Sequence, residues 1–179
     1  MSVHADLDHI DGVLAPFRDV IGPDFEGYRN HVARMATFCL MLRACNAEEQ
    51  QRIEVAACFH DIGLWTARTL DYLEPSVPPA IEYLEKQKLA HWSSEIREMI
   101  LEHHRIRPIR GARSPLVELF RRGDLVDFSL GLVRSGLPAE AIREVKRELP
   151  NAGFHRCLAK RAARWFLAHP TNPAPMMKW

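Results

Sequence analysis

The adjacent pair His60-Asp61 is the part of this sequence whose residue types most directly suggest metal chemistry. The pair follows the apolar run 53–59 and comes just before Gly63, a residue type that often ends helices. An imidazole and a carboxylate at a helix end can bind one cation together where the backbone turns. Such a dipeptide also arises by chance, so the interpretation depends on other residues of the chain.

Two aspartates lie on the apolar side of a helix that is expected to begin at Ser114. Asp124 continues a series of large apolar residues spaced by four, and Asp127 follows three positions later. A carboxylate on a buried face needs a cation, an arginine or N–H donors beside it. We therefore expect Asp124 to bind a metal and Asp127 to form a salt bridge, with Arg121 and Arg122 as the nearest partners in the sequence.

The order of these residues resembles that of the HD-domain metal-dependent phosphohydrolases. His31, then His60-Asp61, then Asp124 lie on three different helices of an all-α chain, and the segment 122–127 (RGDLVD) is similar to the family's segment around its last ligand. The resemblance covers about residues 28–131. It implies that His31, His60, Asp61 and Asp124 bind the cation. Nitrogen and oxygen ligands of this kind suit Mn, Fe, Co, Ni or Zn better than calcium, and the choice among these metals stays open.

Three further histidines, His91, His103 and His104, form a second candidate group. In HD proteins with two metals, histidines between the HD pair and the last aspartate hold the second ion, and an adjacent pair such as His103-His104 is typical. The cyclic-dinucleotide phosphodiesterases of the family are disfavoured, because residues 105–108 replace the Gly-Tyr-Pro signature that should follow this pair. The single-metal nucleotidases often carry a glutamate soon after the HD pair, where this chain has residues 64–66 (LWT).

Proton donation is therefore expected from His103 or His104. The alternative for the pair is a helix C-terminus, where the helix dipole favours histidine.

Arginines are concentrated between the histidine pair and Asp124. The sequence places six of them there, with Glu118 as the one glutamate: Arg105, Arg107, Arg110, Arg113, Arg121 and Arg122. The planar guanidinium group matches the geometry of phosphate oxygens. We expect Arg105 and Arg122 to bind an anionic substrate, because each lies within two residues of a candidate site residue. The alternative is a solvated, charged loop.

Helical periodicity runs through almost the whole chain and predicts an all-α fold. We expect a single-domain helical bundle of the HD-domain type with about seven or eight helices over residues 1–169, followed by a proline-rich C-terminal tail, 170–179, that packs on the domain. Helices are expected at about 6–20, 24–45, 46–60, 80–89, 93–104, 114–127, 138–149 and 153–168. Residues 71–79, which contain three prolines, and residues 105–113 are expected to be loops.

Composition narrows the range of partners. The 179 residues carry a formal net charge of +1, so no basic excess favours a nucleic-acid polymer or a membrane surface. The first residues do not resemble a signal peptide, and no run approaches the roughly 20 apolar residues of a membrane span. We expect a cytoplasmic protein with a small anionic, phosphorylated substrate. The four cysteines have no Cys-x-x-Cys spacing and are expected to be reduced core thiols. The oligomeric state stays open.

Three functions are compatible with these residues. The leading hypothesis is a metal-dependent phosphohydrolase that uses a metal-activated water on a nucleotide or another small phosphorylated metabolite, with Asp61 as ligand and orienting group. One or two cations per chain are possible. The first alternative is a di-iron HD-type oxygenase of a small organophosphonate or polyol, in which His91, His103 and His104 are ligands. The second alternative is a non-catalytic HD-type sensor module.

Overall fold

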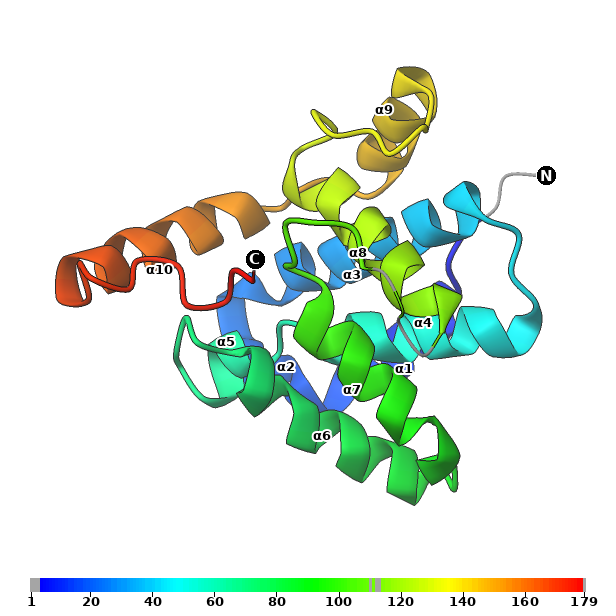
Figure 1. Cartoon of the computed structure of the whole chain (residues 1–179), viewed down its shortest axis with the longest axis horizontal. Helices are drawn as coiled ribbons and strands as arrows, with labels where there is room; N and C mark the ends of the chain where they lie inside the picture. Colours follow the sequence, from blue (N-terminus) through cyan, green and yellow to red (C-terminus); the bar gives the residue numbers. More distant parts are fainter. Residues whose placement is uncertain (1–3, 110, 112–113, 179) are drawn as a thin grey trace.

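Helices and the turns between them make up the computed structural model, which describes residues 4–109, 111 and 114–178 (Figure 1). In this part of the chain, eight α-helices have eight or more residues: α1 (Leu7–Leu14), α3 (Phe25–Leu42), α4 (Ala47–Phe59), α6 (Leu73–Lys86), α7 (Ser93–Glu102), α8 (Pro115–Phe128), α9 (Ala139–Glu148) and α10 (Phe154–Ala168). Two four-residue helices, α2 (Arg18–Ile21) and α5 (Gly63–Thr66), and three short 3-10 turns connect them. The prediction of an all-α fold is confirmed.

Helices α3 and α8 pack closely at the centre of the molecule, and Gly123 makes their close approach possible. A Cβ atom at Gly123 would lie 2.9 Å from the carbonyl oxygen of Met35 and 3.1 Å from the amide nitrogen of Cys39. Both atoms belong to the backbone of α3, so neither can move aside cheaply. The missing side chain therefore lets α8 carry the residues after Gly123 to the surface of α3.

Local signals fix the ends of the helices that carry the candidate residues. Helix α4 begins with the expected capping box, in which the Asn46 side chain accepts from the Glu49 amide at 2.9 Å and the Asn46 amide donates to the Glu49 side chain at 3.0 Å. The helix ends at Phe59, so His60 and Asp61 lie in the turn before α5. At the start of α8, the Ser114 hydroxyl accepts from the Leu116 amide.

The expectation of a loop at residues 71–79 is wrong, because α6 already begins at Leu73. Pro75 lies in the first turn, where an amide N–H has no partner within the helix. Pro78 and Pro79 lie further inside, but they are adjacent and remove only two consecutive amide donors. Apolar residues on one face of α6, including Val77 and Ala80, are buried and compensate for this loss.

The expected continuous helix over residues 6–20 is also interrupted. Helix α1 ends at Leu14, and a 3-10 turn at Ala15–Phe17 separates it from α2. Pro16 lies in this turn. Its ring cannot donate a backbone hydrogen bond and clashes with the preceding helical turn, so the chain changes direction there.

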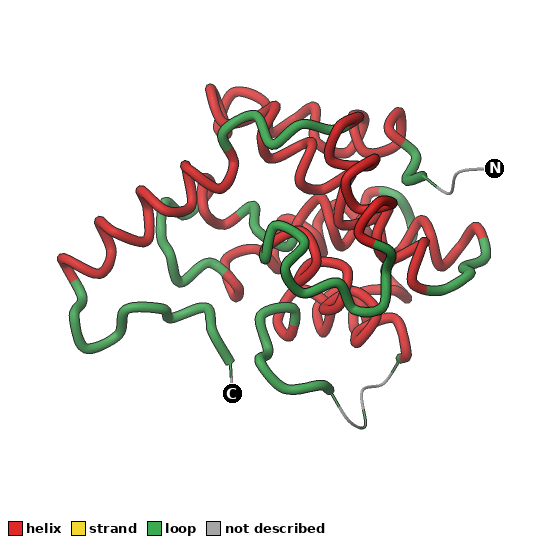
Figure 2. Tube along the Cα trace, turned by 90° about the horizontal axis from the view of Figure 1, so that it is seen from above, coloured by secondary structure: helices red, strands yellow, loops and turns green. Residues whose placement is uncertain are grey.

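Helix α10 extends away from the central helices, and the C-terminal tail runs back from its far end as a loop (Figures 1 and 2). Phe154 is the buried residue of α10. The returning tail is fixed near its end, where the Ile106 amide donates to the Lys178 carbonyl at 2.9 Å. Met176 is partly buried against the core, as expected for the tail. Trp179 lies outside the described residues.

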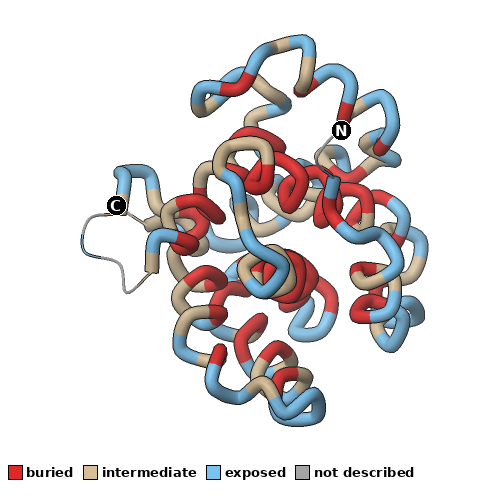
Figure 3. Tube along the Cα trace, turned by 90° about the vertical axis from the view of Figure 1, so that its right-hand side faces the viewer, coloured by how far each residue is buried: buried red, intermediate tan, exposed pale blue. Residues whose placement is uncertain are grey.

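The buried core follows the central helices and thins toward α9 and α10 (Figure 3). Cys39 and Cys58 are buried within it, Cys45 and Cys157 are partly buried, and all four are free thiols. No helix within the described ranges is long and apolar enough to cross a membrane.

Candidate metal centre

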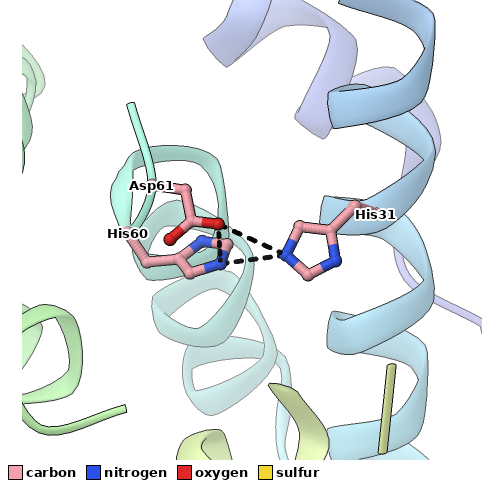
Figure 4. Close-up of side chains that lie close together, drawn as sticks. All are labelled: His31, His60 and Asp61. Carbon is pink, nitrogen blue, oxygen red and sulfur yellow. Dashed lines mark hydrogen bonds and ion pairs between the residues drawn. The ribbon is translucent and has the colours of Figure 1, made fainter. Parts of the chain in front are cut away.

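Four side chains from three segments meet in the interior between α3, α8 and the end of α4. His31 comes from α3, His60 and Asp61 follow α4, and Asp124 comes from α8. Figure 4 shows three of them, with the rings of His31 and His60 and the carboxylate of Asp61 directed toward one another. All four are buried, with exposed fractions of 3 % or less.

The distances between the donor atoms fit a shared cation. The Nε2 atoms of His31 and His60 are 3.0 Å apart, and they lie 3.8 and 3.4 Å from Oδ2 of Asp61. Oδ1 of Asp124 lies 3.6 Å from Nε2 of His31 and 3.8 Å from Nε2 of His60. Ligand atoms bound to one first-row metal at about 2.0–2.2 Å are roughly 3.0–3.5 Å from each other. The observed set is close to this spacing and slightly wider at its carboxylates.

Hydrogen bonds on the far side of the rings turn the Nε2 atoms toward the centre. The Nδ1 atom of His60 donates to the Ala57 carbonyl at 2.7 Å, and that of His103 donates to the Ile100 carbonyl at 2.7 Å. A carbonyl only accepts, so these nitrogens carry the proton. Burial lowers the pKa of His60 to about 3, which leaves its Nε2 atom with a free lone pair at neutral pH. That lone pair points at His31 and is suited to bind a metal.

Asp127 orients His31 and is itself held by an arginine. Its Oδ2 atom accepts from Nδ1 of His31 at 2.7 Å, while Arg34 donates from Nε to Oδ1 at 2.6 Å and from Nη2 to Oδ2 at 2.7 Å. Burial opposes ionisation of Asp127, but His31 and Arg34 outweigh it and hold its pKa below the usual range. The expected salt bridge is therefore present, with Arg34 in place of the expected Arg121 or Arg122.

Those two arginines have other partners because α8 turns them away from Asp127. Arg121 forms an ion pair with Glu118 at 2.7 Å, and Arg122 donates to the Ser135 carbonyl at 2.6 Å. A carboxylate–histidine pair of the Asp127–His31 kind commonly supports metal ligands in proteins.

Asp61 also belongs to a second buried group, with His103 and His104. Its Oδ1 atom lies 3.4 Å from Nε2 of His103, and neither atom has a hydrogen-bond partner among the described residues. Two buried polar atoms without partners are costly, and a cation bound between them would satisfy both. One oxygen of Asp61 thus faces each group, so Asp61 would offer a donor atom to a cation held by either group.

His104 has a separate partner outside the centre. The Tyr72 hydroxyl lies 2.5 Å from its Nε2 atom. Burial raises the pKa of Tyr72, so the hydroxyl stays protonated and donates a hydrogen bond to His104. Burial, reinforced by the charge of His103, lowers the pKa of His104 well below its usual value. His104 is therefore a neutral ring near pH 7.

The structure does not bring His91 to this group. His91 is exposed in the 3-10 turn Ala90–Trp92, where its ring contacts Trp92. The ten-residue helix α7 separates it from His103, a span of about 15 Å. The three histidines expected as ligands of a second cation are thus reduced to His103 and His104.

The arginines expected to bind substrate have protein partners in the structure. Arg105 pairs with Glu102 at 2.7 Å, and Arg122 has the Ser135 contact described above. Arg107 is exposed, and Arg110 and Arg113 lie outside the described residues. The role of Arg105 and Arg122 in substrate binding stays a prediction.

The centre combines groups with opposite pKa shifts. Burial raises the pKa of Asp124 to about 6, although nearby histidines oppose the effect. Burial acts in the same sense on Asp61, but His60 and His103 outweigh it and hold its pKa below the usual range. The pKa of His103 is raised, because the carboxylates of Asp61 and Asp124 overcome the effect of burial. Pairs of groups shifted apart in this way are typical of functional sites.

Arg34 and Tyr72 are the contributors that sequence reasoning missed. Arg34 follows His31 by three positions, which places both on one face of a helix, and this spacing could have revealed it. Tyr72 had no comparable signal, because it lies in the segment 71–79, whose prolines favoured a loop. Phe154 comes from the start of α10, and its ring stacks on His31 with 4.1 Å between the ring centroids. No signal in the sequence indicated this contact either.

Comparison with known proteins agrees with the sequence pattern. The family model described as the HD domain matches residues 28–149, a segment that is well over half of the chain and contains every candidate ligand named above. Neither the curated proteins nor the solved structures gave a match. HD domains bind divalent metals, and the buried histidines and aspartates of this chain are grouped so that they could hold one. The chain belongs to the HD-domain family.

Proposed function

We propose that the chain is a metal-dependent hydrolase of a phosphate ester, acting on a small phosphorylated metabolite. The observation that carries the proposal is the buried set of four donor groups, with His31 Nε2 and His60 Nε2 at 3.0 Å and both close to Asp61 and Asp124. His31, His60, Asp61 and Asp124 would hold the cation. A bound divalent cation supplies Lewis acidity that makes water nucleophilic near neutral pH.

The chain's own residues supply orientation and protons. Asp127 and Arg34 fix the ring of His31, and the Ala57 carbonyl fixes that of His60. The pKa of His103 is raised by the carboxylates of Asp61 and Asp124, whereas that of His104 is lowered, so His103 is the better of the two adjacent histidines to protonate a leaving oxygen. His104, with its lowered pKa, acts as a neutral ring oriented by Tyr72.

The substrate would be a small anion, and its phosphate would lie next to the four donor groups. Arg105 and Arg122 are the candidates to neutralise its oxygens, provided that they leave Glu102 and the Ser135 carbonyl when substrate binds. Mixed imidazole and carboxylate donors favour Mn, Fe, Co, Ni or Zn.

Metal content and phosphate release test the proposal together. The full chain is purified without added metal or chelator, its metals are measured as atoms per chain, and it is assayed against phosphate esters with each of the five metals. Asp124→Ala should lose the metal and the activity and remain helical by circular dichroism. Asp8→Asn, an acidic-to-neutral change at an exposed position of α1, serves as the matched control. An Asp124→Ala protein that is fully loaded and active would overturn the assignment.

A second candidate function follows from the two groups that share Asp61. If both hold iron, the centre could activate O2 and oxidise an organophosphonate or a polyol. This reading predicts close to two irons per chain after aerobic purification, oxygen consumption with substrate and no turnover without oxygen. About one equivalent of metal and equal turnover with and without oxygen would instead support the hydrolase.

A further inference from the structure

A positively charged pocket lies along α10, beginning at the N-terminus of this helix. Its volume is about 370 Å³. Four cationic side chains of α10 line it, namely Arg156, Lys160, Arg161 and Arg164, together with one carboxylate, Asp24, from the 3-10 turn before α3. The whole chain has a formal net charge of only +1, so this concentration of cations is local. The positive pocket therefore suits an anion.

The one carboxylate of the positive pocket is already used by Arg161. Oδ2 of Asp24 accepts from Nη2 of Arg161 at 3.3 Å and from the Trp65 indole N–H at 3.0 Å. Arg161 also donates to the Leu64 carbonyl at 3.0 Å, and its guanidinium group lies 5.3 Å from the centre of the Trp65 ring. Arg161 is thus held in place, and its charge is balanced by Asp24.

The other three cations of the positive pocket are unpaired. Arg156, Lys160 and Arg164 are exposed, and among the described residues none of them has a hydrogen-bond or ion-pair partner. They are spaced by four positions, so they form one line along α10, where like charges repel and destabilise a helix. The helix contains no aspartate or glutamate to offset them. A bound anion would remove this repulsion.

A neighbouring hollow extends the positive surface. It has a volume of about 280 Å³, shares Arg161 and Arg164 with the positive pocket and adds Arg68. Within the described part of the chain, no aspartate or glutamate lines it. Binding sites for small molecules measure about 300–1,000 Å³, so the positive pocket has the size of such a site. The size and the spread of charge favour a ligand with more than one anionic group.

The positive pocket is separate from the candidate metal centre. None of the candidate metal ligands lines it. In the first turn of α10, Phe154 points inward and stacks on His31, whereas Arg156 lines the pocket. Two positions correspond to about 200° around a helix, so these side chains lie on nearly opposite faces of α10. A ligand of the positive pocket would therefore not be the molecule that reacts at the metal centre.

We propose that the positive pocket is a second binding site, which takes a small polyanion with two or more linked phosphate groups. Guanidinium and ammonium groups both bind phosphate oxygens. Two linked phosphates carry about three negative charges near neutral pH, which matches the three unpaired cations. The inference goes beyond the proposed function and does not depend on it.

Calorimetric titration of the full chain with inorganic triphosphate and with inorganic phosphate tests the inference. At about 0.15 M salt, triphosphate should bind at one site and at least about tenfold more tightly than phosphate. Arg156→Gln combined with Lys160→Gln should weaken triphosphate binding at least about tenfold. Both side chains are exposed and unpaired, so this variant should fold normally. The control is Arg143→Gln with Arg147→Gln, which removes two exposed cations at the same spacing from α9 and should change the affinity less than about twofold.

Two further measurements place the bound triphosphate. The NMR signal of the Trp65 indole N–H, which is bonded to Asp24, should shift, whereas that of Trp92, which is bonded to Glu48, should not. Asp124→Ala should bind triphosphate as tightly as the unchanged chain. Binding that is lost in Asp124→Ala but kept in Arg156→Gln with Lys160→Gln would place the triphosphate at the metal centre and overturn the inference. That result would leave the proposed function intact.

Vesicles distinguish a small free ligand from a membrane surface that carries phosphate headgroups. The full chain is sedimented with vesicles of phosphatidylcholine and phosphatidylserine at about 0.15 M salt. The chain should stay in solution. Sedimentation with the vesicles, or equal affinities for triphosphate and phosphate, would overturn the inference.

Discussion

Ionisation of Asp124 has opposite effects on folding and on metal binding. Burial raises its pKa to about 6 in the metal-free protein, above the ordinary value of 3.8 that it regains on unfolding. The stabilising contribution of protonated Asp124 is therefore complete below about pH 4 and is lost as the pH rises through 6. At pH 7.5 the metal-free protein carries an ionised, poorly solvated carboxylate, which a cation would neutralise.

Asp124→Asn removes that charge and keeps the shape of the side chain. We expect the metal-free variant to be more stable than the unchanged chain at pH 7.5 by about 1–3 kcal/mol, with little difference at pH 4. Its affinity for zinc should fall by at least about 100-fold, because a donor is lost. Urea unfolding at the two pH values and calorimetric titration with zinc measure these effects. A metal-free variant that is less stable at pH 7.5 would show that the carboxylate is stabilised by partners other than a metal.

Arg34 and Asp127 form a buried ion pair whose two roles can be separated. Asp127→Ala leaves the guanidinium of Arg34 buried without its partner carboxylate. This change should lower the free energy of unfolding by about 3–5 kcal/mol. It also removes the carboxylate that orients His31, so zinc affinity should fall by about 10- to 100-fold.

The double variant Arg34→Met with Asp127→Leu distinguishes these two effects. It replaces the pair by apolar side chains and should recover most of the stability. Zinc affinity should stay low, because His31 still lacks its partner. Recovery of both stability and affinity would mean that Asp127 acts on metal binding only through the fold.

The contact between α3 and α8 can be tested at Gly123. Gly123→Ala pushes a methyl group against the Met35 carbonyl and the side chain of Cys39, so α8 must move away from α3. We expect a loss of about 1–3 kcal/mol in stability and a weaker metal affinity, since Asp124 moves with the helix. Gly12→Ala is the control, because no atom lies within 4 Å of its added Cβ. There the change to alanine should stabilise α1 by up to about 1 kcal/mol. Equal thermal unfolding curves for the two variants would contradict this account of the helix contact.

Elements with strong local signals were predictable, and those decided by packing were not. The capping box of Asn46 and the Ser114 cap fixed the starts of α4 and α8, and hence the position of His60 directly after α4 and of Asp124 within α8. The helix through Pro78 was missed because apolar burial along α6 outweighs the local cost of proline. The separation of His91 from His103 depends on the direction in which α7 points, which spacing alone does not determine.

At the scale of the whole molecule, the candidate centre links helices that are otherwise joined by packing. Metal binding should therefore raise the unfolding temperature, by about 5–10 °C for free zinc at 100 times its dissociation constant. The effect should shrink below about pH 6, where Asp124 takes up a proton and zinc affinity should fall about tenfold per pH unit. Thermal unfolding with zinc and with a chelator, at pH 5 and pH 7.5, measures both. An equal zinc effect at the two pH values would exclude Asp124 as a ligand.

The candidate ligands lie far apart along the chain, and this has a consequence for when a cation can bind. His31 and His60 are separated by 29 positions, and Asp124 follows on α8 after three further helices, α5, α6 and α7. An unfolded chain offers one ion little more than the adjacent His60-Asp61 pair, since gathering the other donors costs the entropy of closing long loops. Uptake of metal in the cell would thus follow assembly of the native helices, and incompletely folded copies would compete poorly for a scarce ion.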